Sequence, residues 1–185
     1  MHERRFHNDI VRLRSPERLA RLEANRVVEL VTQDTNIRNV LDVGTGSGVF
    51  AEAFVHTGLD VEGLDANSEM LTAARELVPG VRFQEGIAES LPYPDAVFDL
   101  VFMGLLFHET DDRLKAMQEA VRVTRRWVAI LEWPYETQDF GPGLEERLTE
   151  KEMQKLAFHA GLAVPQIFHL QSLVLYLLEK RNSML

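Results

Sequence analysis

Val40-Leu41-Asp42-Val43-Gly44-Thr45-Gly46-Ser47-Gly48 is the stretch of sequence that determines the fold. A short apolar run leads directly into three alternating glycines, and a helical pattern follows from Ser47 to Thr57. Glycines permit a tight turn and a close approach of the backbone to a ligand, and the first turn of a helix offers free N–H groups. The stretch therefore predicts a strand, a loop and a helix with a ligand held at the loop. A turn without a ligand would have the same residue pattern.

The spacing of the glycines and the next acidic residue restrict the class of ligand. A nicotinamide-binding loop would place its third glycine where this chain has Val49, and a phosphate-binding P-loop needs a Gly-Lys-Ser/Thr sequence that does not follow here. Asp65 ends the next apolar run, where a carboxylate can accept hydrogen bonds from both hydroxyls of a ribose. Aspartate is also common in turns, but its position just after the glycine loop favours a nucleoside cofactor.

Apolar runs and helical patterns alternate along the chain. The predicted strands are 39–43, 61–64, 81–84, 98–103, 127–133, 164–169 and 173–178. The predicted helices are 47–57, 68–78, 111–124 and a last one from the capping box of Thr149 and Glu152 to Gly161, and a helical segment begins at Ser15 and Pro16. We therefore expect a doubly wound α/β fold. Its seven-stranded sheet is mostly parallel with an antiparallel C-terminal hairpin strand, and its ligand site lies at the carboxyl ends of the strands.

Composition limits the other possibilities. The 185 residues suit one domain over 1–185, in which 1–33 forms an arm and a helix that cover the site. A net charge of −9 disfavours a nucleic-acid partner, and the absence of cysteine excludes disulfides and thiolate chemistry and fits a cytoplasmic protein. The first 14 residues do not resemble a signal peptide, and no apolar run approaches the ~20 residues of a membrane span.

With these motifs in this order, the chain resembles the class I S-adenosylmethionine-dependent methyltransferases nearly end to end. The matching segments are 40–48, Asp65, 86–93, 98–104 and 106–109, and the nearest relatives are small-molecule enzymes of the ubiquinone and menaquinone type. The resemblance implies S-adenosylmethionine as the cofactor. It implies cofactor contacts by Asp42, Gly44, Thr45, Gly46, Gly48, Asp65, Ala66, Asn67, Ala88, Glu89, Met103 and Gly104.

One position departs from the family pattern. Many relatives carry an aspartate that contacts the adenine amino group where this chain has Ile87. An isoleucine side chain accepts no hydrogen bond. Backbone groups, Glu89 or apolar packing must therefore hold the adenine.

Candidate catalytic residues lie after the fourth and fifth predicted strands. His108 is the first candidate for a general base because its ordinary pKa lies near neutrality, although a structural histidine is the alternative. Glu132 offers a second base or an orienting group, and Tyr135 with Trp133 could line an acceptor pocket, unless Trp133 is core and Glu132 a cap. Glu109 is a weaker candidate.

Two further segments could close the site. The long segment 134–148 lacks helical spacing and is expected to be a loop with a function such as a substrate lid. Phe6 and Arg12 of the N-terminal arm could close over the same opening. The remaining histidines have no metal-ligand spacing, so no metal site is expected.

The predicted function is transfer of the methyl group of S-adenosylmethionine to a small-molecule acceptor. Two alternatives stay open, a non-catalytic S-adenosylmethionine-binding regulatory protein and a nicotinamide-dependent oxidoreductase. The acceptor atom and a homo-oligomeric state are open as well.

Overall fold

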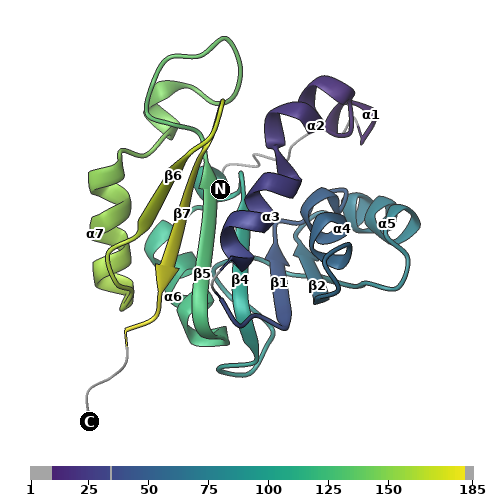
Figure 1. Ribbon diagram of the computed structural model, residues 1–185, viewed down its shortest axis with the longest axis horizontal. Coiled ribbons are helices and arrows are strands. Elements are labelled where there is room, and N and C mark those ends of the chain that lie inside the picture. The colour runs from purple at the N-terminus through teal and green to yellow at the C-terminus, as the bar shows by residue number, and fades with distance from the viewer. Residues whose placement is uncertain (1–9, 34, 182–185) are drawn as a thin grey trace.

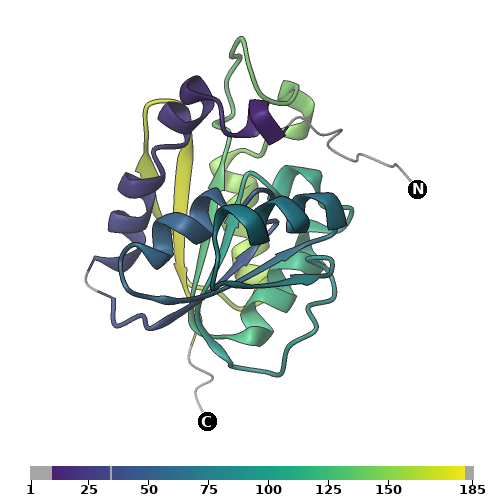
Figure 2. The same ribbon diagram turned by 90° about the vertical axis from the view of Figure 1, so that its right-hand side faces the viewer.

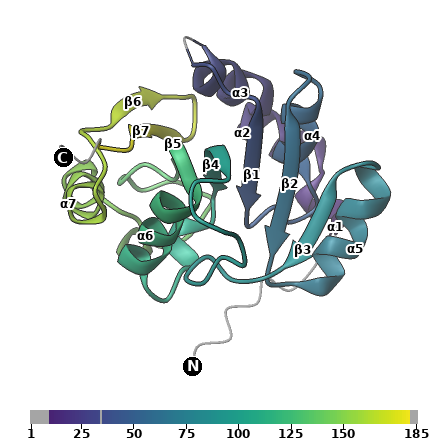
Figure 3. The same cartoon turned by 90° about the horizontal axis from the view of Figure 1, so that it is seen from below.

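The computed structural model describes residues 10–33 and 35–181, and its centre is a seven-stranded sheet (Figures 1 and 3). The strands lie in the order β3-β2-β1-β4-β5-β7-β6. They are β1 (Asn39–Val43), β2 (Asp60–Asp65), β3 (Arg82–Glu85), β4 (Phe98–Gly104), β5 (Thr124–Glu132), β6 (Gln166–His169) and β7 (Val174–Glu179). The predicted doubly wound sheet is confirmed.

The direction of each strand follows from its connection. Strands β1 to β5 pair in parallel, and β1 lies between β2 and β4. Strand β7 pairs antiparallel with both β5 and β6, as the short link between the last two apolar runs predicted. The chain therefore winds outward in both directions from the neighbouring strands β1 and β4, and the loops after these strands meet at one end of the sheet.

Helices cover both faces of the sheet (Figure 2). One layer holds α3 (Ala24–Thr32), α4 (Val49–Val55) and α5 (Ser68–Leu77), and the other holds α6 (Arg113–Val123) and α7 (Glu150–Ala160). The short helices α1 (Ile10–Leu13) and α2 (Pro16–Leu22) lie at the same end of the molecule as the loop after β5 (Figure 1). No helix of the described ranges is long and apolar enough to cross a membrane.

The core consists of two apolar clusters, one under each helix layer. Alternate residues of β4 serve the two sides, with Leu100 and Phe102 facing the layer of α3 to α5 and Val101 and Met103 facing α6 and α7. This alternation is the period-two geometry of a strand buried on both faces.

The helices differ from the predicted ranges by one or two residues at several ends, and two of the differences have a clear cause. The helical pattern after Ser15 is interrupted at Glu23, whose φ of 46° ends α2 and begins α3. The Glu23 carboxylate accepts a hydrogen bond from the Gln171 amide at 2.9 Å, so a distant contact accompanies the break. Helix α4 begins at Val49 rather than Ser47 because Gly48, with φ of 79°, still belongs to the glycine turn. The capping box of Thr149 and Glu152 is confirmed.

Candidate active site

The glycine loop after β1 is bonded to the end of β2. The amides of Gly44 and Thr45 both donate to the Leu64 carbonyl, at 2.7 and 3.0 Å. The Asp65 carboxylate accepts from the Gly46 amide and the Asn67 amide, each at 2.8 Å. Asp65, the last residue of β2, therefore helps to shape the glycine loop. The ribose contact expected for Asp65 lies beside this loop.

Glycine is required at two positions of the loop for different local reasons. Gly46 has φ of 53°, and a Cβ there would meet nothing within 4 Å, so its backbone borders open space. A Cβ on Gly48 would lie 3.0 Å from Val78 and 3.5 Å from Ala74. Gly46 therefore keeps the loop open towards a ligand, whereas Gly48 allows α4 to pack closely on α5 and its C-terminal turn.

Two carboxyl groups, those of Asp42 and Asp65, meet at this loop. Asp42 is 1% exposed and accepts a hydrogen bond from the Thr45 hydroxyl at 2.7 Å. Burial, together with the charge of Asp65, raises the pKa of Asp42 to about 7, and burial also raises the pKa of Asp65. Neither carboxylate forms an ion pair within residues 10–33 and 35–181. A ligand that combines ribose hydroxyls with positive charge fits these two hydrogen-bond acceptors, and S-adenosylmethionine has both.

The elevated pKa of Asp42 gives a stability prediction for the protein without cofactor. Between its ordinary pKa of 3.8 and its folded value of about 7, the folded protein holds a proton that the unfolded chain has released. Stability therefore falls as pH rises through this range, by about 4 kcal/mol in total. Asn cannot ionise, so Asp42→Asn should raise the free energy of unfolding at pH 8. The expected gain is about 1–3 kcal/mol, because burying the N–H groups of the Asn side chain offsets part of it.

Urea unfolding of both proteins at pH 5 and pH 8 measures this difference. The advantage of the Asn variant should disappear at pH 5, where Asp42 is protonated in the folded protein. Parallel stability curves for the two proteins would mean that Asp42 titrates normally.

The second half of the site is a buried histidine–glutamate pair. His108 lies in the short helix η1 (Phe107–Glu109) after β4, and Glu132 is the last residue of β5. Nδ1 of His108 is 2.9 and 3.0 Å from the two oxygens of Glu132, and the His108 amide donates to the same carboxylate at 3.1 Å. The two side chains are only 8% and 4% exposed.

Glu132 determines both the tautomer and the charge preference of His108. An ionised carboxylate only accepts hydrogen bonds, so Nδ1 carries the proton and Nε2 of the neutral ring is left with its lone pair. Burial lowers the pKa of His108, but the hydrogen bond and charge of Glu132, with the charges of Glu109 and Glu146, outweigh burial and raise it above 6.5. Nε2 is 3.6 Å from Glu109, whose own pKa is raised mainly by burial.

Several predicted cofactor residues already have partners within the protein. The Asn67 side chain accepts the amides of Glu69 and Met70 and caps α5. Glu89 accepts the amides that precede α6, including that of Asp111 at 3.0 Å. Ile87 is 52% exposed. The cofactor contacts of Asn67 and Glu89 stay predictions, and both residues hold the loops that border the site.

Other predicted residues lie in the core or at the surface. Met103 has no exposed surface and Ala88 only 5%, so their side chains belong to the apolar core. Ala66 is exposed beside Asp65, and Gly104 packs against Phe50 and Phe102.

Of the two aromatic residues expected to line the acceptor pocket, Trp133 lies in the core and Tyr135 is exposed. Tyr135 is 53% exposed and forms no hydrogen bond within the described residues. Trp133 is 5% exposed and is core, while Glu132 accepts its amide as a local cap. The structure thus brings Glu132 to His108, and the role of Tyr135 stays a prediction.

Sequence reasoning missed three arginines, Arg14, Arg18 and Arg21, in the N-terminal segment. Arg14 donates to Ser47 and Glu52 beside the glycine loop, and its bond to Glu52 is 2.8 Å long. The charge of Glu109 acts on Arg18, and the Arg21 guanidinium lies 3.8 Å from the Phe140 ring in the loop after β5. Arg18 and Arg21 are three positions apart in α2 and lie on one face of it, which was the available signal, whereas Arg14 lies in the turn before α2. Arg12 is exposed in α1, and Phe6 lies outside the described residues.

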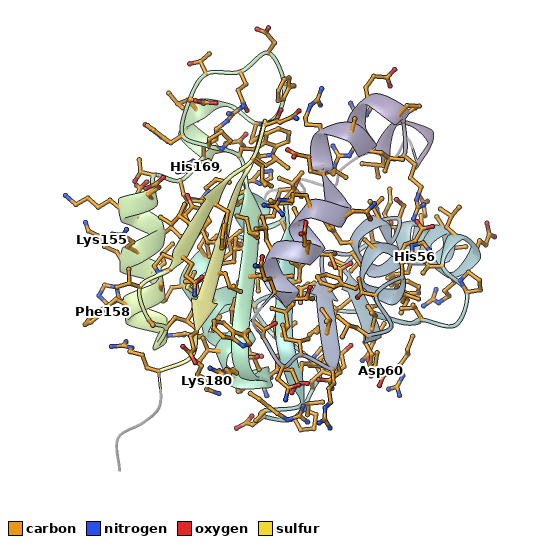
Figure 4. All side chains as sticks on the ribbon, in the orientation of Figure 1. His56, Asp60, Lys155, Phe158, His169 and Lys180 are labelled. Atoms are coloured by element: carbon orange, nitrogen blue, oxygen red, sulfur yellow. The ribbon has the colours of Figure 1, made fainter. Side chains whose placement is uncertain are left out.

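The other histidines are dispersed. Figure 4 shows His56 on one side of the molecule and His169 on the other. Within the ranges that the structure covers, no three His, Asp or Glu side chains form a metal-binding group.

The fold and the loop geometry define a Rossmann-like domain whose site suits a nucleoside cofactor with a positive charge. Comparison with known proteins agrees with this class. The methyltransferase domain family matches residues 41–129. The crystal structure of a SAM-dependent methyltransferase from Aquifex aeolicus superposes with a TM-score of 0.81 at 28% identity, covering 92% of this chain and 96% of that one.

Two curated relatives are similar in sequence. A demethylmenaquinone methyltransferase of Renibacterium salmoninarum is 30% identical over 135 residues, which are 73% of this chain and 55% of the relative. The uncharacterized methyltransferase YcgJ of Bacillus subtilis is 40% identical over 92 residues, which are 47% of this chain and 36% of the relative. The chain thus spans about half or less of the length of these relatives. In sequence and in fold it is similar to the class I S-adenosylmethionine-dependent methyltransferases.

Proposed function

We propose that this protein transfers the methyl group of S-adenosylmethionine to a small-molecule acceptor, with His108 as the general base and Glu132 as its orienting partner. The observation that carries the proposal is the buried pair itself, with Nδ1 of His108 at 2.9 Å from Glu132. The pair lies at the carboxyl ends of β4 and β5, next to the strand β1 whose loop suits the cofactor.

The cofactor would supply an activated methyl group on a positively charged sulfur. Asp42 and Asp65, with the Gly46 turn, would hold it at the end of β1 and β2. The remaining task of the protein is to align the acceptor, exclude water and remove a proton. His108 would accept this proton on Nε2, and the resulting imidazolium is stabilised by Glu132 at Nδ1.

The pair favours acceptors that must lose a proton before or during transfer. A hydroxyl group or an acidic carbon needs a base, whereas a thiolate or a neutral amine needs only alignment. A demethylmenaquinone methyltransferase is among the relatives, and we infer an oxygen or carbon acceptor on a small molecule for this chain. The net charge of −9 argues against a nucleic-acid substrate.

Cofactor binding gives the direct test of the class. Either S-adenosylmethionine or S-adenosylhomocysteine at 100 times its Kd should add about 2.7 kcal/mol to the free energy of unfolding, because only the folded protein binds it. For a chain of this size the melting temperature should rise by roughly 5–11 °C. Thermal unfolding with each compound, and with NAD as the control, measures the shift. No shift at millimolar concentration together with a flat calorimetric titration would contradict the proposed cofactor.

A further inference from the structure

We propose that the loop 134–148 is a preformed wall of the acceptor site rather than a hinged lid, and that Arg147 is the positioning residue that holds it against the His108–Glu132 pair. The inference rests on the proposed role of that pair. It concerns the segment that begins two residues after Glu132.

One buried guanidinium binds the loop along most of its length. Arg147 is 5% exposed. Its three nitrogens donate to four backbone carbonyls and one side-chain oxygen, at 2.7 to 3.1 Å, belonging to Pro134, Glu136, Gln138, Phe140 and Pro142. Since the acceptors come from alternate residues of one segment, the guanidinium determines the path of the whole loop. A segment that swings as a lid would have to break these bonds in a buried place.

The same loop wraps around a core aromatic. A Cβ on Gly141, which has φ of 85°, would approach the Trp133 indole to 2.9 Å, so the backbone lies directly on the ring. Phe140 packs against this indole with ring centroids 5.7 Å apart. The guanidinium carbon of Arg147 also lies 5.6 Å from the centroid of the Trp133 ring. Trp133 follows Glu132, and the packing therefore joins the loop to the end of β5.

A second arginine joins the end of the loop to the histidine. Arg113, the first residue of α6, donates to the Glu146 carbonyl at 2.8 Å and to the His108 carbonyl at 3.4 Å. Arg147 closes the loop onto Pro134, two residues after Glu132, at 3.1 Å. The backbone of His108 and the residues that follow Glu132 are thus held by two guanidinium groups, one at each end of the loop.

This arrangement predicts that loosening Arg147 disturbs the geometry of the pair. The pKa of His108 lies above its ordinary value because of Glu132, with Glu109 and Glu146 adding to the effect, and the charge of Arg147 is not among the causes. Loss of a positive charge alone would raise a histidine pKa, whereas loss of alignment with Glu132 would lower it. The direction of the change therefore separates positioning from simple electrostatics.

The experiment compares wild type, Arg147→Met and Arg147→Lys as full chains without acceptor. Carbon-13-labelled histidine NMR follows the titration of His108, assigned by its loss in His108→Gln. The pKa of His108 should fall towards 6.5 in both variants. Amide exchange of Glu136 and Glu146, whose amides bond within the loop to Pro134 and Gly143, should become roughly tenfold faster or more. Affinity for S-adenosylhomocysteine should change by no more than about threefold, since the hydrogen bonds of Arg147 go to the loop after β5 and not to the glycine loop.

Arg125→Met is the matched control. Arg125 is 50% exposed and pairs with Asp99 near the amino ends of the strands, so this variant should leave all three measurements unchanged. If Arg147→Met does not fold, the same measurements are made on Arg147→Lys and Gln138→Ala. The second variant removes the one side-chain oxygen that accepts a hydrogen bond from Arg147, at 2.8 Å.

Two outcomes would overturn the proposal. Unchanged loop exchange in variants that fold means that Arg147 does not hold the loop, and faster exchange with an unchanged pKa of His108 means that it is structural only. Failure of the proposed function is a separate result, because His108→Gln would then retain turnover while the effect of Arg147 on the pKa persisted.

Discussion

His108→Gln is expected to lower the rate of methyl transfer by about 10²- to 10⁴-fold while S-adenosylhomocysteine affinity stays within about twofold. The His108 ring is bonded to Glu132 at 2.9 Å, and it is not among the groups that bond to Asp65 in the described residues. Glutamine keeps a polar group of similar length but cannot take up a proton at neutral pH. Single-turnover measurement with saturating cofactor isolates the transfer step.

The pH dependence of the rate should identify the ionising group. A base acts only when it is unprotonated, so the rate should rise with pH and level off above the pKa of His108. Since that pKa is raised by Glu132, the rise should lie above pH 6.5. Glu132→Gln removes the charge while keeping an oxygen acceptor, and it should move the rise to lower pH. His108→Gln should lack the rise altogether.

The matched control is His56→Gln. Figure 4 shows His56 on the outer side of the molecule, and it is exposed at the end of α4. It should retain the wild-type rate and profile. A His108→Gln protein with full turnover but a lower melting temperature would return His108 to a structural role.

The fold was predictable where its signals are local. The glycine loop, the capping box of Thr149 and Glu152 and the short link to the last hairpin each involve residues within a few positions of one another, and the structure has all three elements. The break at Glu23 was not predictable in this way. It coincides with a bond to Gln171, and no local pattern encodes a contact across 148 positions.

The site was predictable in its parts but not in its pairings. His108 and Glu132 follow strands that pair in parallel, so their closeness follows from topology, whereas the bond through Nδ1 depends on side-chain orientation. Arg147 carries no sequence signal, because its partners are backbone carbonyls, which every residue has. Tyr135 has the chemistry of a site residue, and its 53% exposure does not decide whether it contacts the acceptor.

The second large effect is expected at Asp65. Asp65→Asn should weaken S-adenosylhomocysteine binding by about 10- to 100-fold, because a charged hydrogen bond to a ribose hydroxyl contributes about 1.5–3 kcal/mol. The carboxylate already accepts the amides of Gly46 and Asn67, each with one of its oxygens, and each oxygen has a further lone pair. Asparagine keeps one acceptor oxygen for these amides and loses the second oxygen and the charge. Calorimetric titration at constant pH measures the change in Kd.

The bonds to Gly46 and Asn67 also mean that Asp65 has a structural share, so affinity alone does not establish the ribose contact. The ribose contact is tested by comparing the affinities for adenosine and for 2′-deoxyadenosine. Wild type should prefer adenosine, and Asp65→Asn should lose most of that preference if the carboxylate accepts the missing hydroxyl. Asp60→Ala is the control, because Asp60 is an exposed carboxylate at the opposite end of the same strand (Figure 4). Equal loss of both nucleosides in Asp65→Asn, with a lower melting temperature of the apo protein, would mean that Asp65 acts by shaping the glycine loop and not by binding the ribose.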